Sequence, residues 1–385
     1  MDPAQYQPSD FGQATREPGD KRAFWYFMPT PIPQSLTLDA ATVVALSEAD
    51  SALGLLEGLG RLVRDPQTLI GPSLRREALA SSRIEGTQAS LSDVLRAEVG
   101  AAGGEDTAEV ERYLAAAKRG YDLMERLPIT GRMIRELHEI LLRGGRGQTR
   151  TPGEFRRSPV WVGAAGETLD NARFVPPPPG QLSDLMADWE KFVNQPSPQP
   201  PLIRCALMHY QFETIHPFLD GNGRIGRLLI NLMLVQEKRL TIPLLYVSGY
   251  LEANRRDYYD RLQAVRERGD IQGWLDFFLR AVRGSAADAV ARAGALIELR
   301  EAFLADAASA RSRLPRLINP IIDNPYLTVD RISRELGLST QGARNLIRQA
   351  QEKGWVSEVG TAGRGGRMYW LADRVLTAME QPPSH

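Results

Sequence analysis

The sequence predicts a mainly α-helical protein with one small β-hairpin and a compact mixed unit near its C-terminal end. Apolar residues recur every three or four positions over long stretches, as between Leu202 and Phe212, which is typical of helices with a buried face. Alternating apolar residues and a tip rich in turn residues predict a hairpin within residues 158–179. Beyond residue 326, two short helical patterns are followed by two strand patterns.

Composition narrows the class of protein. The 385 residues suffice for two or three domains with a sizeable core. Lys plus Arg and Asp plus Glu number 47 each, so binding to nucleic acid or membrane would require a local patch. The single cysteine, Cys205, excludes an internal disulfide and fits a reducing compartment. No apolar run approaches ~18 residues, and the N-terminus is polar, so we expect a cytoplasmic protein with no membrane partner.

One segment, residues 216–227 (HPFLDGNGRIGR), lies between two helical patterns and predicts a phosphate site. Gly221 and Gly223 let the backbone approach a ligand closely. The free N–H groups and the dipole of the following helix then favour an anion. Arg224 and Arg227 lie three positions apart and can reach the same polyphosphate. Because cations are unfavourable at a helix N-terminus, their presence there indicates a bound anion.

Two residues of the segment add reaction chemistry. Asp220 suits Mg²⁺ that is held by one carboxylate and by the phosphates themselves. His216 has the ordinary pKa of a general base at neutral pH. The two glycines alone could form a plain connector, but the full combination favours a phosphate site with a base.

The twelve residues match the H-P-F-x-D-G-N-G-R-x-x-R motif of the Fic family and resemble its AMP-transferring branch in particular. The resemblance runs from about residue 35 to about residue 285. It implies a helical Fic core and a protein adenylyltransferase that moves AMP from ATP, with Mg²⁺, to a Ser, Thr or Tyr hydroxyl of a target protein or of itself. It makes His216 the catalytic base and Asp220 the metal ligand. The ATP-binding residues that it implies are Gly221, Asn222, Gly223, Arg224, Ile225, Gly226, Arg227, Tyr258 and Tyr259.

A second match to the family lies upstream. Residues 78–87 predict a helix that ends at Gly86, where Glu85 taken alone is a solvated carboxylate that favours a nearby cation. Ser81-x-x-x-Glu85-Gly86 is similar to the inhibitory motif of many Fic proteins. The resemblance implies that Glu85 pairs with Arg227 and blocks the productive pose of the ATP γ-phosphate, because a carboxylate and a phosphate compete for one guanidinium.

The predicted hairpin resembles the substrate-docking flap of the family. Trp161, Val162 and Gly163 lie in its first half. The resemblance implies that an extended segment of the target protein pairs with this edge through its backbone. The alternative is a hairpin that only covers the core.

Two features near the expected nucleotide site need separate interpretation. Tyr258 and Tyr259 have a spacing typical of core residues, but the resemblance places them near the adenosine. Arg266 falls where some relatives have an asparagine, which departs from the family pattern. His138 is expected to be a packed or capping histidine rather than a catalytic one.

The expected domain order has five parts. A disordered arm with a docked aromatic cluster is followed by a helical region with the inhibitory motif, the Fic core, a connector helix and a unit that resembles a winged helix-turn-helix; their bounds are 1–34, 35–115, 116–285, 286–315 and 316–380.

The last unit leaves the partners open. Its basic residues could bind DNA phosphates; they are Arg344, Arg348, Lys353, Arg364 and Arg367. Winged helices also dock proteins or form homodimers. The alternative functions are therefore a DNA-binding regulator with the Fic core as nucleotide sensor, and a de-AMPylating enzyme that uses the same site.

Overall fold

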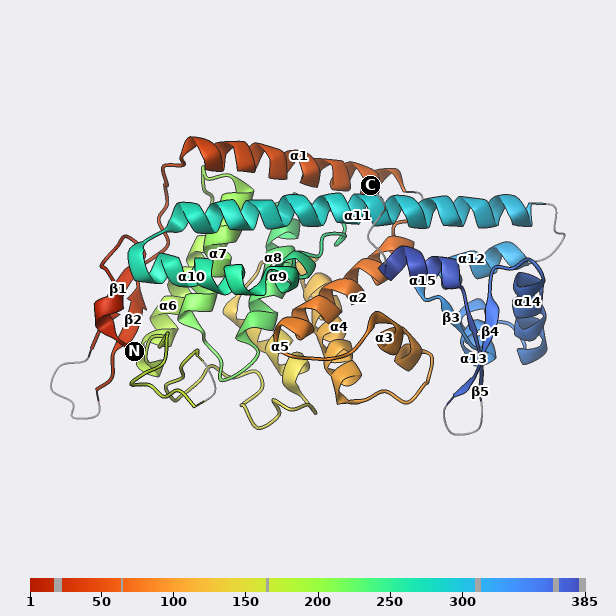
Figure 1. Cartoon of the computed structure of the whole chain (residues 1–385), viewed down its shortest axis with the longest axis horizontal. Coiled ribbons are helices and arrows are strands. Elements are labelled where there is room, and N and C mark those ends of the chain that lie inside the picture. The colour runs from red at the N-terminus through yellow and green to blue at the C-terminus, as the bar shows by residue number, and fades with distance from the viewer. Residues whose placement is uncertain (17–22, 64, 164–165, 309–312, 363–366, 381–385) are drawn as a thin grey trace.

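The computed structural model describes residues 1–16, 23–63, 65–163, 166–308, 313–362 and 367–380, and its fold is mainly helical with small antiparallel sheets (Figure 1). The helices are α1 (Ala40–Leu62), α2 (Gln67–Ile84), α3 (Leu91–Glu98), α4 (Glu105–Met124), α5 (Gly131–Leu142), α6 (Leu182–Asn194), α7 (Pro201–Ile215), α8 (Asn222–Gln236), α9 (Ser248–Ala253), α10 (Arg255–Arg268), α11 (Ile271–Ala307), α12 (Ile318–Asp323), α13 (Val329–Leu336), α14 (Thr340–Glu352) and α15 (Asp373–Glu380). The strands are β1 (Gly12–Thr15), β2 (Tyr26–Pro29), β3 (Tyr326–Leu327), β4 (Ser357–Ala362) and β5 (Arg367–Leu371). Within the described residues no helix has the length and apolarity to cross a bilayer.

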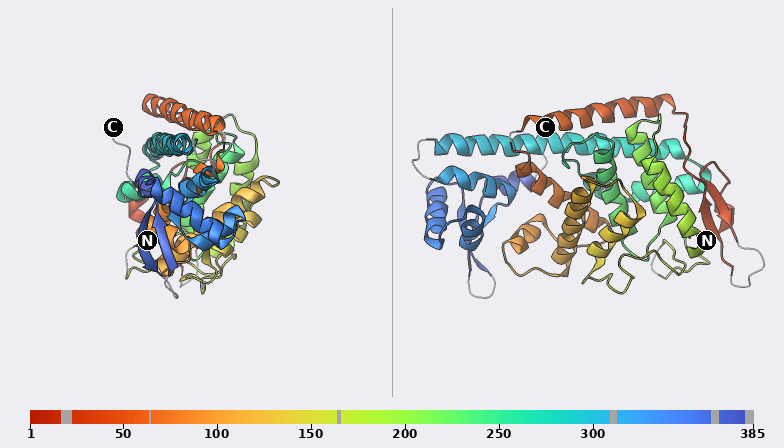
Figure 2. Two further views of the ribbon diagram at one scale, coloured as in Figure 1. Left: turned by 90° about the vertical axis from the view of Figure 1, so that its right-hand side faces the viewer. Right: turned by 180° about the vertical axis from the view of Figure 1, so that it is seen from behind.

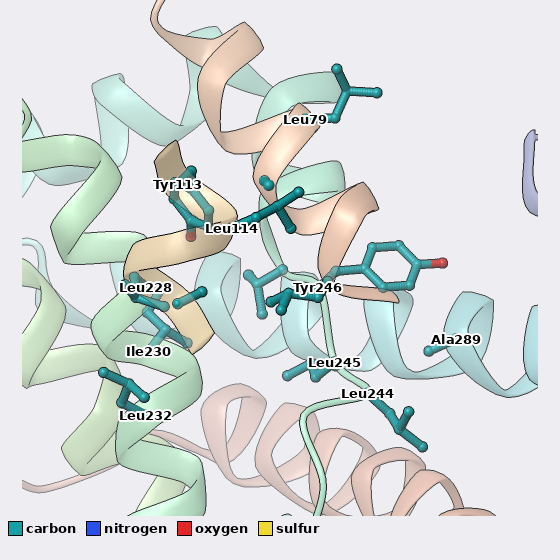
Figure 3. Close-up of a cluster of buried hydrophobic side chains, with 14 of the residues drawn as sticks. Leu79, Tyr113, Leu114, Leu228, Ile230, Leu232, Leu244, Leu245, Tyr246 and Ala289 are labelled. Atoms are coloured by element: carbon teal, nitrogen blue, oxygen red, sulfur yellow. The ribbon is translucent and has the colours of Figure 1, made fainter. Parts of the chain in front are cut away.

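Helices α7 and α8 form the centre of the helical body. Every residue of α7 from Leu202 to Ile215 is buried, including polar ones such as Arg204 and Glu213, so the helix is surrounded by other elements on all sides. Indole N–H groups of Trp189 and Trp274 donate to backbone carbonyls of α7 at 3.1 and 3.0 Å. Figure 3 shows apolar side chains of α8 beside those of α4. The loop between α7 and α8 is therefore held at a fixed place in the core.

Helix α11 runs along most of the molecule, and α1 lies beside it (Figures 1 and 2). Thr42 near the start of α1 donates from its hydroxyl to Asp276 of α11 at 2.7 Å. The expected connector helix is the C-terminal part of this single 37-residue helix, which begins at Ile271. Apolar residues continue along one face across the expected domain boundary, so no break occurs there.

The single cysteine lies deep in α7. Cys205 is fully buried, and its thiol donates to the Ile230 carbonyl of α8 at 3.6 Å. Burial raises the pKa of this thiol well above its ordinary value.

The N-terminal arm is ordered where it is described, contrary to the expected disorder. Strands β1 and β2 pair antiparallel, and the Phe27 amide donates to the Val175 carbonyl at 2.9 Å. Tyr6, Phe27 and Phe174 belong to one small apolar cluster. The aromatic residues therefore dock on the body as expected, and this burial orders the segments that carry them.

The expected hairpin of residues 158–179 does not form regular strands in its described part. Val162 and Phe174 make one isolated antiparallel bridge, with N–O distances of 2.8 and 3.2 Å. The second half of the segment instead bonds to the arm through Val175. We call residues 158–178 the flap; residues 164–165 of its expected tip lie outside the described part.

The C-terminal unit contains α12 to α15 and a sheet of strand order β3-β5-β4. The Arg75 guanidinium of α2 binds the Asp323 carboxylate at 3.1 Å and Glu98 at 2.7 Å. Arg76 of α2 donates to the Met379 carbonyl of α15 at 2.5 Å. The unit thus packs on the N-terminal half of α2. The expected wing residue Arg364 lies outside the described residues.

Arg331 of α13 provides a test of what holds the C-terminal unit together. Its buried guanidinium donates to the carbonyls of Asn324, Tyr326 and Pro320 at 2.7–2.8 Å. Arg331→Met should lower the free energy of unfolding by about 1–3 kcal/mol, because buried carbonyls lose their donors. Arg334→Met, on the exposed side of the same helix, should change it by less than about 0.5 kcal/mol. Urea unfolding followed by tryptophan fluorescence measures both, and equal losses would contradict this role.

Candidate functional site

The loop between α7 and α8 is fixed by its own backbone and by one amide side chain. His216 ends α7 with a left-handed φ of 51°, and Gly221 precedes α8 with a φ of 78°. Asn222 accepts from the Phe218 amide and donates to the Phe218 carbonyl, both at 2.9 Å. Arg156 donates to the His216 carbonyl at 2.8 Å. Asn222 therefore closes the loop and lies behind the site rather than in a cavity.

His138 supports the same loop from α5. Its Nδ1 accepts from the Gly153 amide at 2.9 Å, so Nε2 carries the hydrogen and donates to the Asp220 carbonyl at 2.9 Å. Its ring stacks on Phe218 at 3.7 Å. Burial lowers the pKa of His138 to about 4. This neutral, packed histidine agrees with the expected structural role.

His216 is half-buried and lines a cavity of about 650 Å³. Its Nδ1 lies 3.4 Å from the Glu213 carbonyl, an acceptor, so the neutral ring has its hydrogen on Nδ1 and its lone pair on Nε2. Burial, together with the charges of Arg156 and Arg266, lowers the pKa of His216 to about 3. The imidazole is therefore neutral at physiological pH and can accept a proton.

Arg227 lies at the inner end of this cavity and is held by α2. Its Nε donates to the Ser81 hydroxyl at 2.9 Å, and its Nη2 donates to the Ser81 carbonyl at 2.9 Å and to the Glu85 carboxylate at 2.7 Å. The guanidinium is only 1% exposed. Burial opposes ionisation of Glu85, but the charge of Arg227 lowers its pKa overall. The pairing expected between Glu85 and Arg227 is thus present.

Gly223 leaves room for this ion pair. A Cβ at position 223 would lie 2.5 Å from the Glu85 Oε1 and 2.8 Å from the Arg227 Nη1. Any side chain there would displace one of the two partners. A glycine is needed at the first turn of α8 for the carboxylate to approach the helix.

Arg224 points to a different place. Its guanidinium pairs with the Glu109 carboxylate of α4 and lies 3.3 Å from Asp220. Arg224 and Asp220 line a second cavity of about 200 Å³, and Arg146 also lines it. Sequence reasoning missed Glu109, because it lies 115 positions from Arg224 in a helix with no motif.

The structure separates the predicted residues into groups. Those that line the larger cavity are Glu85, Trp161, Val162, Gly163, His216, Gly223, Arg227 and Tyr259. Tyr258 is buried beside them and donates from its hydroxyl to the His209 Nε2 at 2.8 Å. Ile225 and Gly226 lie in the buried first turn of α8, outside both cavities. Glu85 lines both cavities and therefore stands between them.

Glu213 is a further cavity residue that sequence reasoning missed. It lies one turn before His216, and its Oε1 is buried without a hydrogen-bond donor. Burial raises the pKa of Glu213 to about 7, against the lowering effect of Arg227. A Cβ at Gly226 would lie 2.3 Å from this Oε1, so the glycine of α8 gives the carboxyl its space.

The sequence is similar to known proteins in the region of this site. Protein adenylyltransferase Fic of Drosophila grimshawi is 38% identical over 157 residues, 40% of this chain and 29% of that protein. Its namesake in Aedes aegypti is 39% identical over 151 residues, 39% of this chain and 27% of that one. This chain thus spans less than a third of the length of these relatives.

Solved structures extend the likeness. A Fic family protein from Desulfovibrio desulfuricans G20 has a TM-score of 0.58 and 25% identity, and the alignment covers 89% of this chain and 98% of that chain. Fic-1 of C. elegans, residues 134–508, has a TM-score of 0.53 and 22% identity over 67% of this chain and 74% of its own, a likeness of fold alone. The Fic/DOC family model matches residues 128–234, and the model of the N-terminal region of that family matches residues 43–122. Residues 128–234 are therefore similar to a Fic/DOC domain, and residues 43–122 are similar to the N-terminal region of the same family.

Proposed function

We propose that the chain is a protein adenylyltransferase, which transfers AMP from ATP to a Ser, Thr or Tyr hydroxyl of a target protein and which Glu85 holds in an inhibited state. The names of the relatives support the reaction class. The observation that carries the proposal is the position of Glu85 between the cavity of His216 and that of Asp220 and Arg224.

A triphosphate needs both cavities. Its transferred phosphate belongs beside His216, and its remaining phosphates belong with Arg227, Arg224 and the N-terminus of α8. The Glu85 carboxylate lies on that path and already binds Arg227 at 2.7 Å. Carboxylate and phosphate repel each other and compete for the same guanidinium. Glu85 must therefore dissociate from Arg227 before the triphosphate can occupy both cavities.

The reaction follows from the neutral imidazole. His216 takes the hydroxyl proton at Nε2, and the hydroxyl oxygen forms a bond to the α-phosphorus. The bond from that phosphorus to the bridging oxygen breaks, and its electron pair leaves with pyrophosphate. The amides at the start of α8 and the two arginines oppose the negative charge on the phosphates.

Asp220 is the residue that would hold Mg²⁺. Its side chain is 42% exposed and lines the second cavity. The described residues contain no group of three or more His, Cys, Asp or Glu that could hold a metal. One carboxylate nevertheless fits Mg²⁺, which is usually bound by one or two carboxylates together with phosphates and water. When bound, the ion supplies positive charge to the phosphates.

The flap is the proposed docking edge for the target protein. Trp161 and Val162 are 45% and 36% exposed at the mouth of the cavity. An extended segment that pairs with this edge would bring a hydroxyl toward His216. One bridge between Val162 and Phe174 holds this edge in the described part of the flap.

His216→Ala should abolish transfer while ATP binding stays nearly intact. Loss of a general base lowers the rate by about 10²–10⁴. ATP labelled on the α-phosphate measures transfer to protein, and calorimetry measures binding. Labelling from the γ-phosphate without labelling from the α-phosphate would indicate a kinase instead, and loss of ATP binding would indicate a folding role for His216.

Glu85→Gly should raise self-labelling by roughly tenfold or more, because a charge-assisted contact of about 1.5–3 kcal/mol no longer holds Arg227. Glu85→Gln keeps the shape and loses the charge, so it should fall between the wild type and Glu85→Gly. The double variant with His216→Ala should give no label. An unchanged or lower rate of self-labelling in Glu85→Gly would contradict inhibition by Glu85.

A pulse–chase experiment with unlabelled ATP separates inhibition from removal of AMP, since a de-AMPylating wild type loses its label during the chase.

The C-terminal unit is proposed to be a winged helix-turn-helix, because α13 and α14 are followed by the β4–β5 hairpin. Its expected basic face is partly offset by acids: Lys353 binds Asp306 at 2.9 Å, and Arg348 lies 3.9 Å from Glu352. Such a face favours docking of a protein or a second copy over DNA. A cytoplasmic location stays an expectation.

A further inference from the structure

Arg266 of α10 carries a charge that the protein leaves without an acid partner. It lines the larger cavity and is 6% exposed. Its Nε donates to the Thr214 hydroxyl at 3.2 Å and its Nη1 to the Gln263 amide oxygen at 3.4 Å. Among the described residues, its Nη2 has no hydrogen-bond partner and its guanidinium has no carboxylate within ion-pair distance. A desolvated cation without an anion is unfavourable, so the guanidinium of Arg266 needs a negative charge from a group other than its present neighbours.

Other guanidiniums near His216 have a partner for their charge or for their donors. Arg227 is held by Glu85 and Ser81, although its Nη1 is buried without a hydrogen-bond partner among the described residues, and Arg173 pairs with Asp260 at 2.9 Å. Arg156 donates to backbone carbonyls, among them those of His216 and Pro177. Arg266 therefore differs from Arg227 and Arg173 in lacking a carboxylate partner, and from Arg156 in having an Nη2 without an acceptor among the described residues.

The groups that surround Arg266 do not supply the missing negative charge. Glu213 lies in the same cavity, but its Oε1 is buried without a hydrogen-bond donor among the described residues. Because burial raises the pKa of Glu213 to about 7, much of it is protonated at neutral pH. The hydroxyls of Tyr6, Tyr210 and Tyr258 are neutral, since burial raises their pKa values. An anionic ligand is the partner that fits.

The position of Arg266 identifies the part of the ligand. Arg266 and His216 line the same cavity, and the Nε of Arg266 donates to the hydroxyl of Thr214, two positions before His216 in the chain. The adjoining face of Arg266 is occupied by the Phe174 ring of the flap, whose centroid lies 3.8 Å from the guanidinium carbon. The free edge is thus left for the group that reacts beside His216.

We propose that Arg266 is a substrate-binding residue whose free guanidinium edge binds the phosphate that is transferred. The proposal rests on the proposed function, because that function puts the α-phosphate beside His216. It assigns a role to an arginine where some relatives have an asparagine. A bound phosphate also offsets the charge that Arg266 exerts on His216, so the substrate strengthens its own base.

The test compares AMP with adenosine, which lacks only the phosphate. Calorimetry on the full chain at neutral pH should show that Arg266→Gln weakens AMP binding by about tenfold to a hundredfold, since a charged hydrogen bond is lost. Adenosine binding should be unchanged. Arg266→Lys keeps the charge and should bind AMP with an intermediate affinity. Arg268→Gln is the matched control: it removes the same charge from the exposed face of α10 and should change AMP binding by less than about twofold.

The outcomes separate this proposal from the proposed function. A wild-type chain that binds neither ATP nor AMP would overturn the proposed function. A wild type that binds AMP, together with an Arg266→Gln variant of equal affinity, would overturn the role of Arg266 alone. Equal weakening of AMP and adenosine would also overturn it, because it would indicate a shape effect on the cavity. Circular dichroism shows whether Arg266→Gln folds. If it does not, Arg266→Lys is the deciding variant. An affinity of Arg266→Lys for AMP equal to that of the wild type would contradict binding by the guanidinium edge, because the lysine ammonium lacks that edge.

Discussion

The buried guanidinium of Arg227 is the contact on which the site depends. It is an ion in the interior of a helical body, and such an ion is unfavourable unless it is paired. Ser81 and Glu85 at the end of α2 bind its Nε and Nη2, with contacts of 2.7–2.9 Å, while its Nη1 has no hydrogen-bond partner among the described residues. Helix α2 is thus joined to the first turn of α8 by charge as well as by apolar packing.

The same contact links stability to function. An arginine at the N-terminus of a helix opposes the helix dipole and is retained there at a cost. When the carboxylate occupies it, the arginine stabilises the closed arrangement of α2 and α8. In the proposed function, phosphates occupy it instead, and the same charge serves catalysis. Under that proposal one residue has two mutually exclusive partners, and Gly223 leaves space beside the ion pair.

Much of the site could be predicted because its residues are adjacent in sequence. A histidine, an acid, two glycines and two arginines within twelve positions specify a loop before a helix, and periodicity placed both flanking helices. Tertiary partners could not be predicted in this way. Glu109 reaches Arg224 from 115 positions away, and Glu213 shows its unusual environment only after α7 is buried on all sides.

The errors of sequence reasoning have similar causes. The alternating pattern in the flap is real, but the arm competes for its backbone through Phe27 and Val175, and the regular hairpin is lost. The arm was expected to be disordered from its composition, yet a few buried aromatics are enough to order the described segments. Helix α11 crosses an expected boundary because helix propensity and an apolar face both continue there.

The inaccessibility of Cys205 has a practical consequence for the study of this chain. Its sulfur is sealed between α7 and α8, and its raised pKa keeps it from becoming a nucleophile. Thiol reagents should therefore not react with the native protein. A cysteine placed in the flap can then be coupled to a fluorophore, a spin label or a tethered peptide without first removing the natural one, and motion of the flap can be followed by spectroscopy.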